Sequence, residues 1–196
     1  MASWVPPFQP DNMPAAPPAP WELALLGVAV LALLGVVGGT LHTGAPPMPT
    51  RPGVRATMLQ LLPPEVKCIH ELGAGFGGMA MAAAAAHPDA TVYAWEKAWL
   101  PWLALRLRAA LFGEGRVRVH RGDLLDAPHE QADAVLLYLH PEAMAALAPR
   151  LAQGLLPGAV VVSNSFALPG WEAERTLRLN DALHTTVRRY RATGPG

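Results

Sequence analysis

Hydrophobic and polar positions divide this chain into two parts with different patterns. Residues 23–41, "LALLGVAVLALLGVVGGTL", carry no charged side chain, and a helix of this length can span the hydrocarbon core of a bilayer. A buried core helix and a cleaved signal peptide are the alternatives. Core helices seldom lack polar residues altogether, and a signal peptide begins with positive charge, whereas residues 1–22 contain no Lys or Arg. The pattern therefore predicts an uncleaved transmembrane helix.

From residue 51 onward, segments with helical periodicity alternate with short apolar runs. Helices are expected within 53–62, 77–87, 98–112 and 141–155, and strands within 66–72, 90–96, 116–125, 132–139 and 158–166. Residues 173–192 read as two further strands that alternate around Asn180-Asp181, which is a hairpin signal. This order predicts an α/β, Rossmann-like fold. Its seven-stranded sheet is mostly parallel, has helices on both faces and ends in an antiparallel hairpin.

Composition completes the domain assignment. Residues 1–22 form a Pro/Ala-rich tail that is expected to be disordered, residues 23–41 the transmembrane anchor, residues 42–50 a proline-stiffened linker, and residues 51–196 the folded domain. Arg51, Arg55 and Lys67 follow the apolar segment, so the positive-inside bias predicts a single-pass membrane protein with its domain on the cytoplasmic side.

The segment "CIHELGAGFGGMAMAAAAAHPDATVYAWEK", residues 68–97, places four glycines between an apolar run and an alanine-rich helix. Gly73, Gly75 and Gly78 spell G-x-G-x-x-G, a turn that lets a nucleotide cofactor approach the backbone closely. In an open parallel sheet, ligands bind beyond the carboxyl ends of the strands. The turn therefore predicts a cofactor site, and either NAD(P) or S-adenosyl-L-methionine fits the glycines alone.

Acidic residues at the strand ends separate these two cofactors. Glu71 precedes the glycines, where a carboxylate would repel a pyrophosphate and attract the cationic methionine part of S-adenosylmethionine. Glu96 ends the next strand and can accept hydrogen bonds from both ribose hydroxyls of either cofactor, and Asp123 in "RGDLL" can accept one from the adenine amino group. A dehydrogenase also needs a substrate domain, for which no length remains. S-adenosyl-L-methionine is the predicted cofactor.

Further cofactor contacts are expected beside these acids. Lys97 is included, although its side chain is expected to point away from the cleft. The predicted set of cofactor-binding residues is Glu71, Gly73, Ala74, Gly75, Gly77, Glu96, Lys97, Gly122, Asp123, Leu124 and Tyr138.

Charge and cysteine content exclude some partners. The formal net charge is +0, so electrostatics gives no reason to expect a nucleic-acid partner. The histidines show no shared metal-ligand spacing and Cys68 is the only cysteine, so no metal site is predicted and Cys68 is interpreted as a core residue. The oligomeric state is not predicted.

The motifs "HELGAGFGG", "YAWE" and "RGDL" resemble those of the class I S-adenosylmethionine-dependent methyltransferases. More narrowly, the chain is similar to the membrane-anchored family that includes the mitochondrial lysine methyltransferases of the adenine nucleotide translocase and of the ATP synthase c-subunit. The narrower likeness rests on the apolar N-terminal segment, "PMPTRPGVRATML", "WEKAWLPWLALRLRAAL" and "SNSFALPGW". The resemblance implies N-methylation of a lysine in a membrane protein.

The glycine turn departs from that family's pattern, D-x-G-S-G-D/E-G-R, at two positions. Phe76 stands where the second acid would be and Gly78 where the arginine would be. The first departure removes a carboxylate from the methionine site. It keeps open the alternative of a membrane-tethered binding module without catalytic activity.

The loop after the fourth predicted strand, "YLHPEAM", is the expected acceptor end. His140 can take a proton from an amine, because its unperturbed pKa lies near neutrality. Tyr138 can line the pocket or face the core. His140 and Tyr138 are therefore the candidate catalytic residues, with the alternative that His140 merely caps the following helix or faces solvent. A small lipophilic acceptor or a lipid is the alternative substrate, because a membrane tether would concentrate either kind of acceptor.

Overall fold

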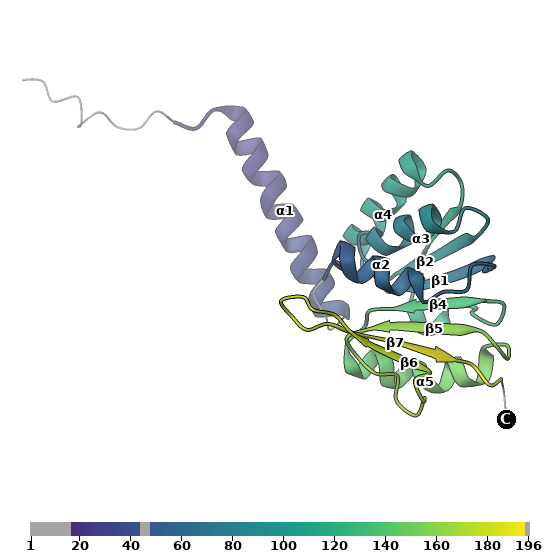
Figure 1. Ribbon diagram of the computed structural model, residues 1–196. Coiled ribbons are helices and arrows are strands. Elements are labelled where there is room, and N and C mark those ends of the chain that lie inside the picture. Colours follow the sequence, from purple (N-terminus) through teal and green to yellow (C-terminus); the bar gives the residue numbers. More distant parts are fainter. Residues whose placement is uncertain (1–16, 44–47, 195–196) are drawn as a thin grey trace, which may run out of the picture. The chain divides into compact units, whose positions relative to one another are not determined.

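The computed structural model describes residues 17–43 and 48–194 (Figure 1). Its contacts divide the chain into two compact units, 1–34 and 35–196. Most of the predicted tail and four of the nine residues of the predicted linker, 44–47, lie outside the described residues, so the four predicted segments stay a prediction.

A seven-stranded sheet forms the centre of the larger unit, in the order β3-β2-β1-β4-β5-β7-β6. Strands β1 (Cys68–Leu72), β2 (Thr91–Glu96), β3 (Val117–Arg121), β4 (Ala134–Leu137) and β5 (Val160–Asn164) are parallel. The last two strands, β6 (Arg175–Arg178) and β7 (Thr186–Arg191), form an antiparallel hairpin, and β7 also pairs antiparallel with β5. The predicted Rossmann-like sheet with its closing hairpin is confirmed.

Helices cover both faces of this sheet. On one face lie α2 (Pro52–Gln60), α3 (Gly78–Ala86) and α4 (Trp99–Phe112), and on the other lies α5 (Pro141–Gly154) (Figure 1). Between β3 and β4 the chain has only a short 3-10 helix, η2 (Leu124–Asp126).

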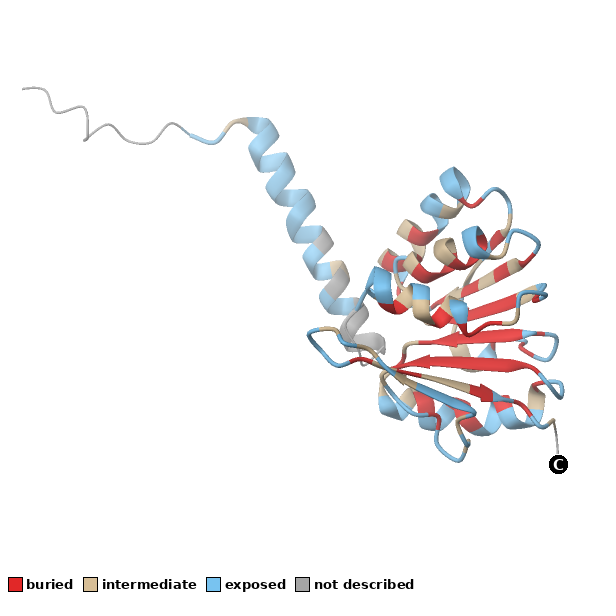
Figure 2. Cartoon of the chain, viewed as in Figure 1, coloured by how far each residue is buried: buried red, intermediate tan, exposed pale blue. Residues whose placement is uncertain are grey.

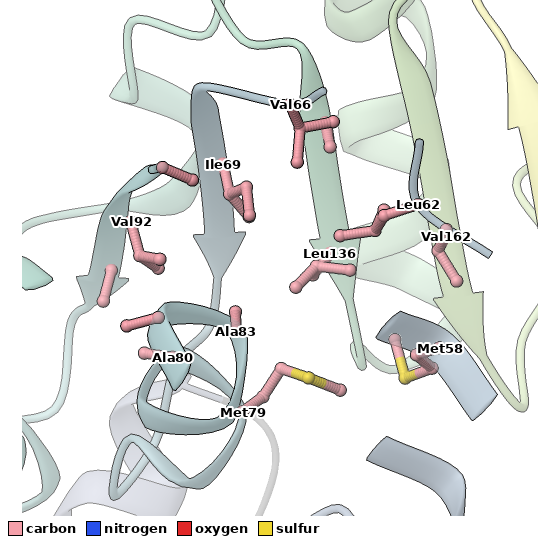
Figure 3. Packing of buried hydrophobic residues seen from close by; sticks show 14 of the residues in the cluster. Met58, Leu62, Val66, Ile69, Met79, Ala80, Ala83, Val92, Leu136 and Val162 are labelled. Atoms are coloured by element: carbon pink, nitrogen blue, oxygen red, sulfur yellow. The ribbon is translucent and has the colours of Figure 1, made fainter. Parts of the chain in front are cut away.

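Two hydrophobic layers result from the alternation of side chains along the strands. In β4, Ala134 and Leu136 face the layer under α3, whereas Val135 and Leu137 face the layer under α5. Helix α3 is rich in alanine, and its Ala80 and Ala83 are fully buried against the sheet. Figure 3 shows these alanines beside Ile69, Val92 and Leu136. Burial is concentrated in the central strands (Figure 2).

Cys68 is a partial exception to the predicted core. It begins β1 and is only half-buried, because the start of the strand lies near the edge of the hydrophobic layer. Burial raises the pKa of its thiol, and the nearby Asp133 carboxylate adds to this effect.

The apolar N-terminal segment forms helix α1 (Pro20–Thr43). Its described leucines and valines are exposed (Figure 2). Within the described residues, however, no helix combines the length and the apolar character needed to cross a membrane. The helix is thus observed where it was predicted, and the membrane crossing is not confirmed.

Candidate active site

A cleft of about 690 Å³ opens at the carboxyl ends of the parallel strands. The sheet order reverses between β1 and β4, because β2 and β3 extend to one side of β1 and β5 to the other. Loops that follow these strands diverge there, which leaves the crevice where ligands bind in open α/β sheets. A volume of this size is typical of small-molecule sites.

The glycine turn forms one wall of the cleft. Gly73, Gly75 and Gly77 adopt φ values of 80°, 54° and 77°. Residues other than glycine rarely adopt this left-handed conformation. A Cβ at Gly73 would lie 2.6 Å from Leu139 Cδ2, and one at Gly77 would lie 2.2 Å from Leu105 Cδ1. A Cβ at Gly75 would meet nothing within 4 Å, since this residue faces the open cleft. The turn thus brings bare backbone to the ligand space at Gly75.

Glu96 ties the end of β2 to the glycine turn. Its Oε2 accepts a hydrogen bond from the Gly75 backbone N–H at 2.8 Å, and its Oε1 accepts one from the Ala98 N–H at 2.7 Å. The residue is buried, yet it lines the cleft. Each carboxylate oxygen keeps acceptor capacity, so Glu96 can hold two ligand hydroxyls, as a ribose offers.

An ion pair closes the next part of the wall. Lys97 Nζ lies 2.9 Å from Asp123 Oδ2, while Asp123 Oδ1 accepts a hydrogen bond from the Leu125 N–H at 3.0 Å. The Leu125 N–H and then the hydrogen bond from Lys97 hold the pKa of Asp123 below its usual value. The expectation that the Lys97 side chain points away from the cleft is therefore wrong, because the carboxylate after β3 draws the ammonium inward. Gly122 packs beside Trp95, whose Cζ3 would lie 3.3 Å from an added Cβ.

Glu71 is the buried acid of the site. Its Oε2 has no hydrogen-bond partner among the described residues, and only 7% of the residue is exposed. The pKa of Glu71 is raised to about 8, chiefly because burial disfavours the carboxylate; the Ala80 backbone N–H lowers it, the neighbouring Glu96 adds to the rise and Arg55 opposes it. An unpartnered buried carboxyl that lines a cleft is suited to a cationic ligand group.

The far end of the cleft, beyond β4 and β5, is mainly apolar and aromatic. Tyr138, Leu139 and His140 line it from the β4 side, and Ser165 and Phe166 from the β5 side. Ser165 has a positive φ of 64°, and its carbonyl accepts a hydrogen bond from Arg188 at 2.9 Å. The strained turn after β5 brings Phe166 to the cleft.

His140 has a defined neighbour there. It occupies the N-cap position of α5, but its side chain makes no capping hydrogen bond, so the capping alternative is not what the structure shows. Its Nδ1 lies 3.1 Å from Glu142 Oε2. Nδ1 has no hydrogen-bond partner among the described residues, so this is a close contact rather than a hydrogen bond.

The structure brings together nearly all residues that the sequence singled out. The residues from that set that line the cleft are Glu71, Gly73, Ala74, Gly75, Glu96, Lys97, Gly122, Asp123, Leu124, Tyr138 and His140. Gly77 is not among the lining residues, because it turns toward Leu105 and begins α3 as its N-cap. Which of these residues hold the cofactor stays a prediction.

Arg55 and Phe166 are among the lining residues that the sequence did not single out as site residues. Arg55, on α2, lines the cleft and donates a hydrogen bond from Nη1 to the Gly78 carbonyl at 3.0 Å. Phe166 also lines the cleft. No local pattern marks Arg55, whereas "SNSF" at the end of a predicted strand was a usable signal for Phe166.

Comparison with known proteins identifies the type of site. The family model described as "ANTKMT methyltransferase domain" matches residues 71–175, which include the glycine turn and the ends of β2 to β5. None of the curated proteins compared matches the chain.

Several solved structures are similar. An RNA methyltransferase from Salinibacter ruber, solved in complex with S-adenosyl-L-homocysteine, is 31% identical, with a TM-score of 0.67 over 74% of this chain and 93% of that chain. A putative methyltransferase, yhhF, from Escherichia coli is 16% identical, with a TM-score of 0.60 over 74% and 88%. A precorrin-6y C5,15-methyltransferase from Geobacter metallireducens is 16% identical, with a TM-score of 0.58 over 74% and 90%. The last two support the fold alone.

Proposed function

Because the chain belongs to the ANTKMT methyltransferase domain family, we propose that it methylates the side-chain amine of a lysine in a membrane protein. The chain is an S-adenosyl-L-methionine-dependent methyltransferase. The family match over residues 71–175 is the observation that carries the choice of acceptor, since the sequence resembles lysine methyltransferases of integral membrane proteins.

The cofactor supplies a methyl group bonded to a sulfonium, and the chain's own residues orient it. In this proposal Glu71 binds the cationic methionine part, Glu96 the ribose hydroxyls and Asp123 the adenine amino group. Two observations support the assignment. Glu71 Oε2 lacks a partner among the described residues, and the bare backbone at Gly75 leaves room beside Glu96.

The apolar end of the cleft suits a neutral amine. A lysine must lose its proton before it can attack, and an apolar surrounding lowers the pKa of an amine because it disfavours the charged form. Leu139 and Phe166 provide such a surrounding. His140 is the proposed proton acceptor, with Nδ1 beside Glu142 and Nε2 left to take the proton. Tyr138 is proposed to line the acceptor channel.

Membrane attachment through α1 is part of the proposal. The helix exposes large apolar side chains, among them Leu26, Leu31 and Leu33. Attachment would raise the effective concentration of acceptors that are themselves in the membrane. The positive charges after the helix favour a domain on the cytoplasmic side.

RNA is a second candidate acceptor, because the Salinibacter ruber relative is described as an RNA methyltransferase and is 31% identical. The formal net charge of +0 weighs against it, since nucleic-acid affinity is dominated by neutralised phosphates.

A single labelling experiment distinguishes these acceptors. The full chain is incubated with methyl-labelled S-adenosylmethionine, native membranes and total RNA, and the protein, lipid and RNA fractions are then separated. We expect the label in protein, recovered as methyl-lysine after acid hydrolysis. Label confined to RNA or to the organic phase would overturn the proposal in favour of that acceptor. A Glu96→Ala chain should label the true acceptor less, because it lacks the carboxylate that is proposed to hold the ribose hydroxyls and that also accepts the Gly75 and Ala98 N–H groups.

A further inference from the structure

Arg55 reaches the first turn of α3 from a different helix. Its Nη1 donates to the Gly78 carbonyl at 3.0 Å, and a Cβ built at Gly78 would lie 2.6 Å from the same Nη1 atom. The guanidinium of Arg55 thus occupies the space into which a side chain at position 78 would extend. An arginine side chain from α2 therefore lies next to the glycine that begins α3.

Most of the hydrogen-bonding capacity of this arginine is unused. A guanidinium carries five N–H donors in a planar fork, and one hydrogen bond from Arg55 is recorded among the described residues. The ion pairs found in the described part of the chain do not include Arg55. The side chain is half-buried and lines the cleft. A cation with free donors at a cleft wall is suited to a carboxylate.

An acidic side chain lies close by. Glu71 lines the same cleft with an unpartnered Oε2, and Arg55 is near enough to lower the pKa of Glu71. This end of the cleft therefore presents one acceptor for a cation and one donor fork for an anion. An α-amino acid group carries these two charges on one carbon.

We propose that Arg55 binds the α-carboxylate of the methionine part of the cofactor while Glu71 binds its ammonium. The inference rests on S-adenosylmethionine as cofactor and is independent of the acceptor. Position 78 has glycine where the resembled family's pattern has arginine. In this proposal the guanidinium of Arg55, on α2, takes that place. A side chain at position 78 would displace the guanidinium from where it now lies.

The test compares two ligands that differ only in the carboxylate. Binding of S-adenosylmethionine and of its decarboxylated analogue, which keeps the amine and the sulfonium, is measured by calorimetry on the full chain without acceptor. The wild-type chain is expected to prefer S-adenosylmethionine by about tenfold to hundredfold, the usual effect of a charge-assisted hydrogen-bond pair. Arg55→Ala is expected to reduce this preference to near onefold.

Two further variants separate recognition from structural support. Gly78→Ala leaves Arg55 in place but displaces its guanidinium, so the preference should fall while α3 gains a better helix former. Arg51→Ala is the matched control, because Arg51 lies on the same segment and pairs with Asp181 at 3.2 Å, away from the cleft. It should leave the preference unchanged.

A purely structural Arg55 would weaken both ligands equally. An unchanged preference in Arg55→Ala would therefore overturn the inference. If Arg55→Ala does not fold, an unchanged preference in Gly78→Ala would overturn it in the same way.

Discussion

Glu71 changes its acid–base behaviour on folding. Its ordinary pKa of 4.5 rises to about 8 in the folded chain, chiefly because burial disfavours the carboxylate. The folded state therefore keeps a proton that the unfolded chain releases. The stabilising effect is fully present below about pH 4.5 and is lost as the pH rises to about 8. A buried carboxyl that can bind a cation therefore lowers the free energy of unfolding at neutral and higher pH.

Cofactor binding should consequently release a proton. At pH 6 to 7.5 the free Glu71 is mostly protonated, whereas the ammonium of a bound ligand favours the carboxylate. We expect S-adenosylhomocysteine binding to release close to one proton near pH 7, and its affinity to weaken by about tenfold for each pH unit below 7. Calorimetry in buffers of different ionisation enthalpy measures the release. In Glu71→Gln the release should vanish, and a release that persists in this variant would assign it to another group.

Residues at strand ends were predictable, and residues that act across elements were not. Glu71, Glu96 and Asp123 could be placed in one cleft because parallel strands bring their carboxyl ends to the same edge. The inward turn of Lys97 depends on its ion pair with Asp123, 26 positions later, and the sequence alone did not indicate the pair. Arg55 acts 23 positions before its partner Gly78, and this contact depends on how α2 packs over α3.

Elements were predicted more reliably than their exact contacts. The order of strands and helices was predictable from the apolar positions. Buried strands are short continuous apolar runs, whereas helices repeat apolar residues every three or four positions. The hairpin signal makes β6 and β7 neighbours, but it does not decide that β7 rather than β6 pairs with β5. The sequence alone does not show which glycine precedes α3 in the left-handed conformation, because both Gly77 and Gly78 can adopt it. In the structure it is Gly77.

The helix α3 and the glycine turn allow stability and binding to be separated. Gly77→Ala forces a left-handed alanine and a 2.2 Å approach to Leu105 Cδ1 of α4, so it should lower the free energy of unfolding by about 2–5 kcal/mol. Gly75→Ala meets no neighbouring atom within 4 Å, so only the left-handed strain of about 1–2 kcal/mol remains. Its methyl group enters the cleft and should weaken S-adenosylhomocysteine instead. Urea denaturation and calorimetry measure the two effects, and equal losses of stability would contradict the packing argument.

At the scale of the whole molecule, the cleft and helix α1 are separate features. The larger unit contains the complete cleft, and α1 adds an apolar surface that the chemistry of the cleft does not require. Exposed apolar area of this kind is unfavourable in water and favours transfer into a less polar phase. If α1 attaches the enzyme to a membrane, acceptors in that membrane are favoured by their high local concentration as well as by the shape of the cleft.

Membrane attachment is therefore the property to test on the intact chain. We expect the full chain to remain with membranes after an alkaline carbonate wash. Leu26→Asp combined with Leu33→Asp should release it, because an aspartate at the centre of a membrane helix costs about 2.5–3.5 kcal/mol. Leu183→Asp is the matched control, since Leu183 is 65% exposed in the loop between β6 and β7 and Leu33 is 63% exposed. This control should stay with the membranes. The released double variant should still bind S-adenosylhomocysteine but methylate membrane acceptors more slowly. A full chain found in the supernatant, or a double variant that stays in the pellet, would show that α1 is not the attachment.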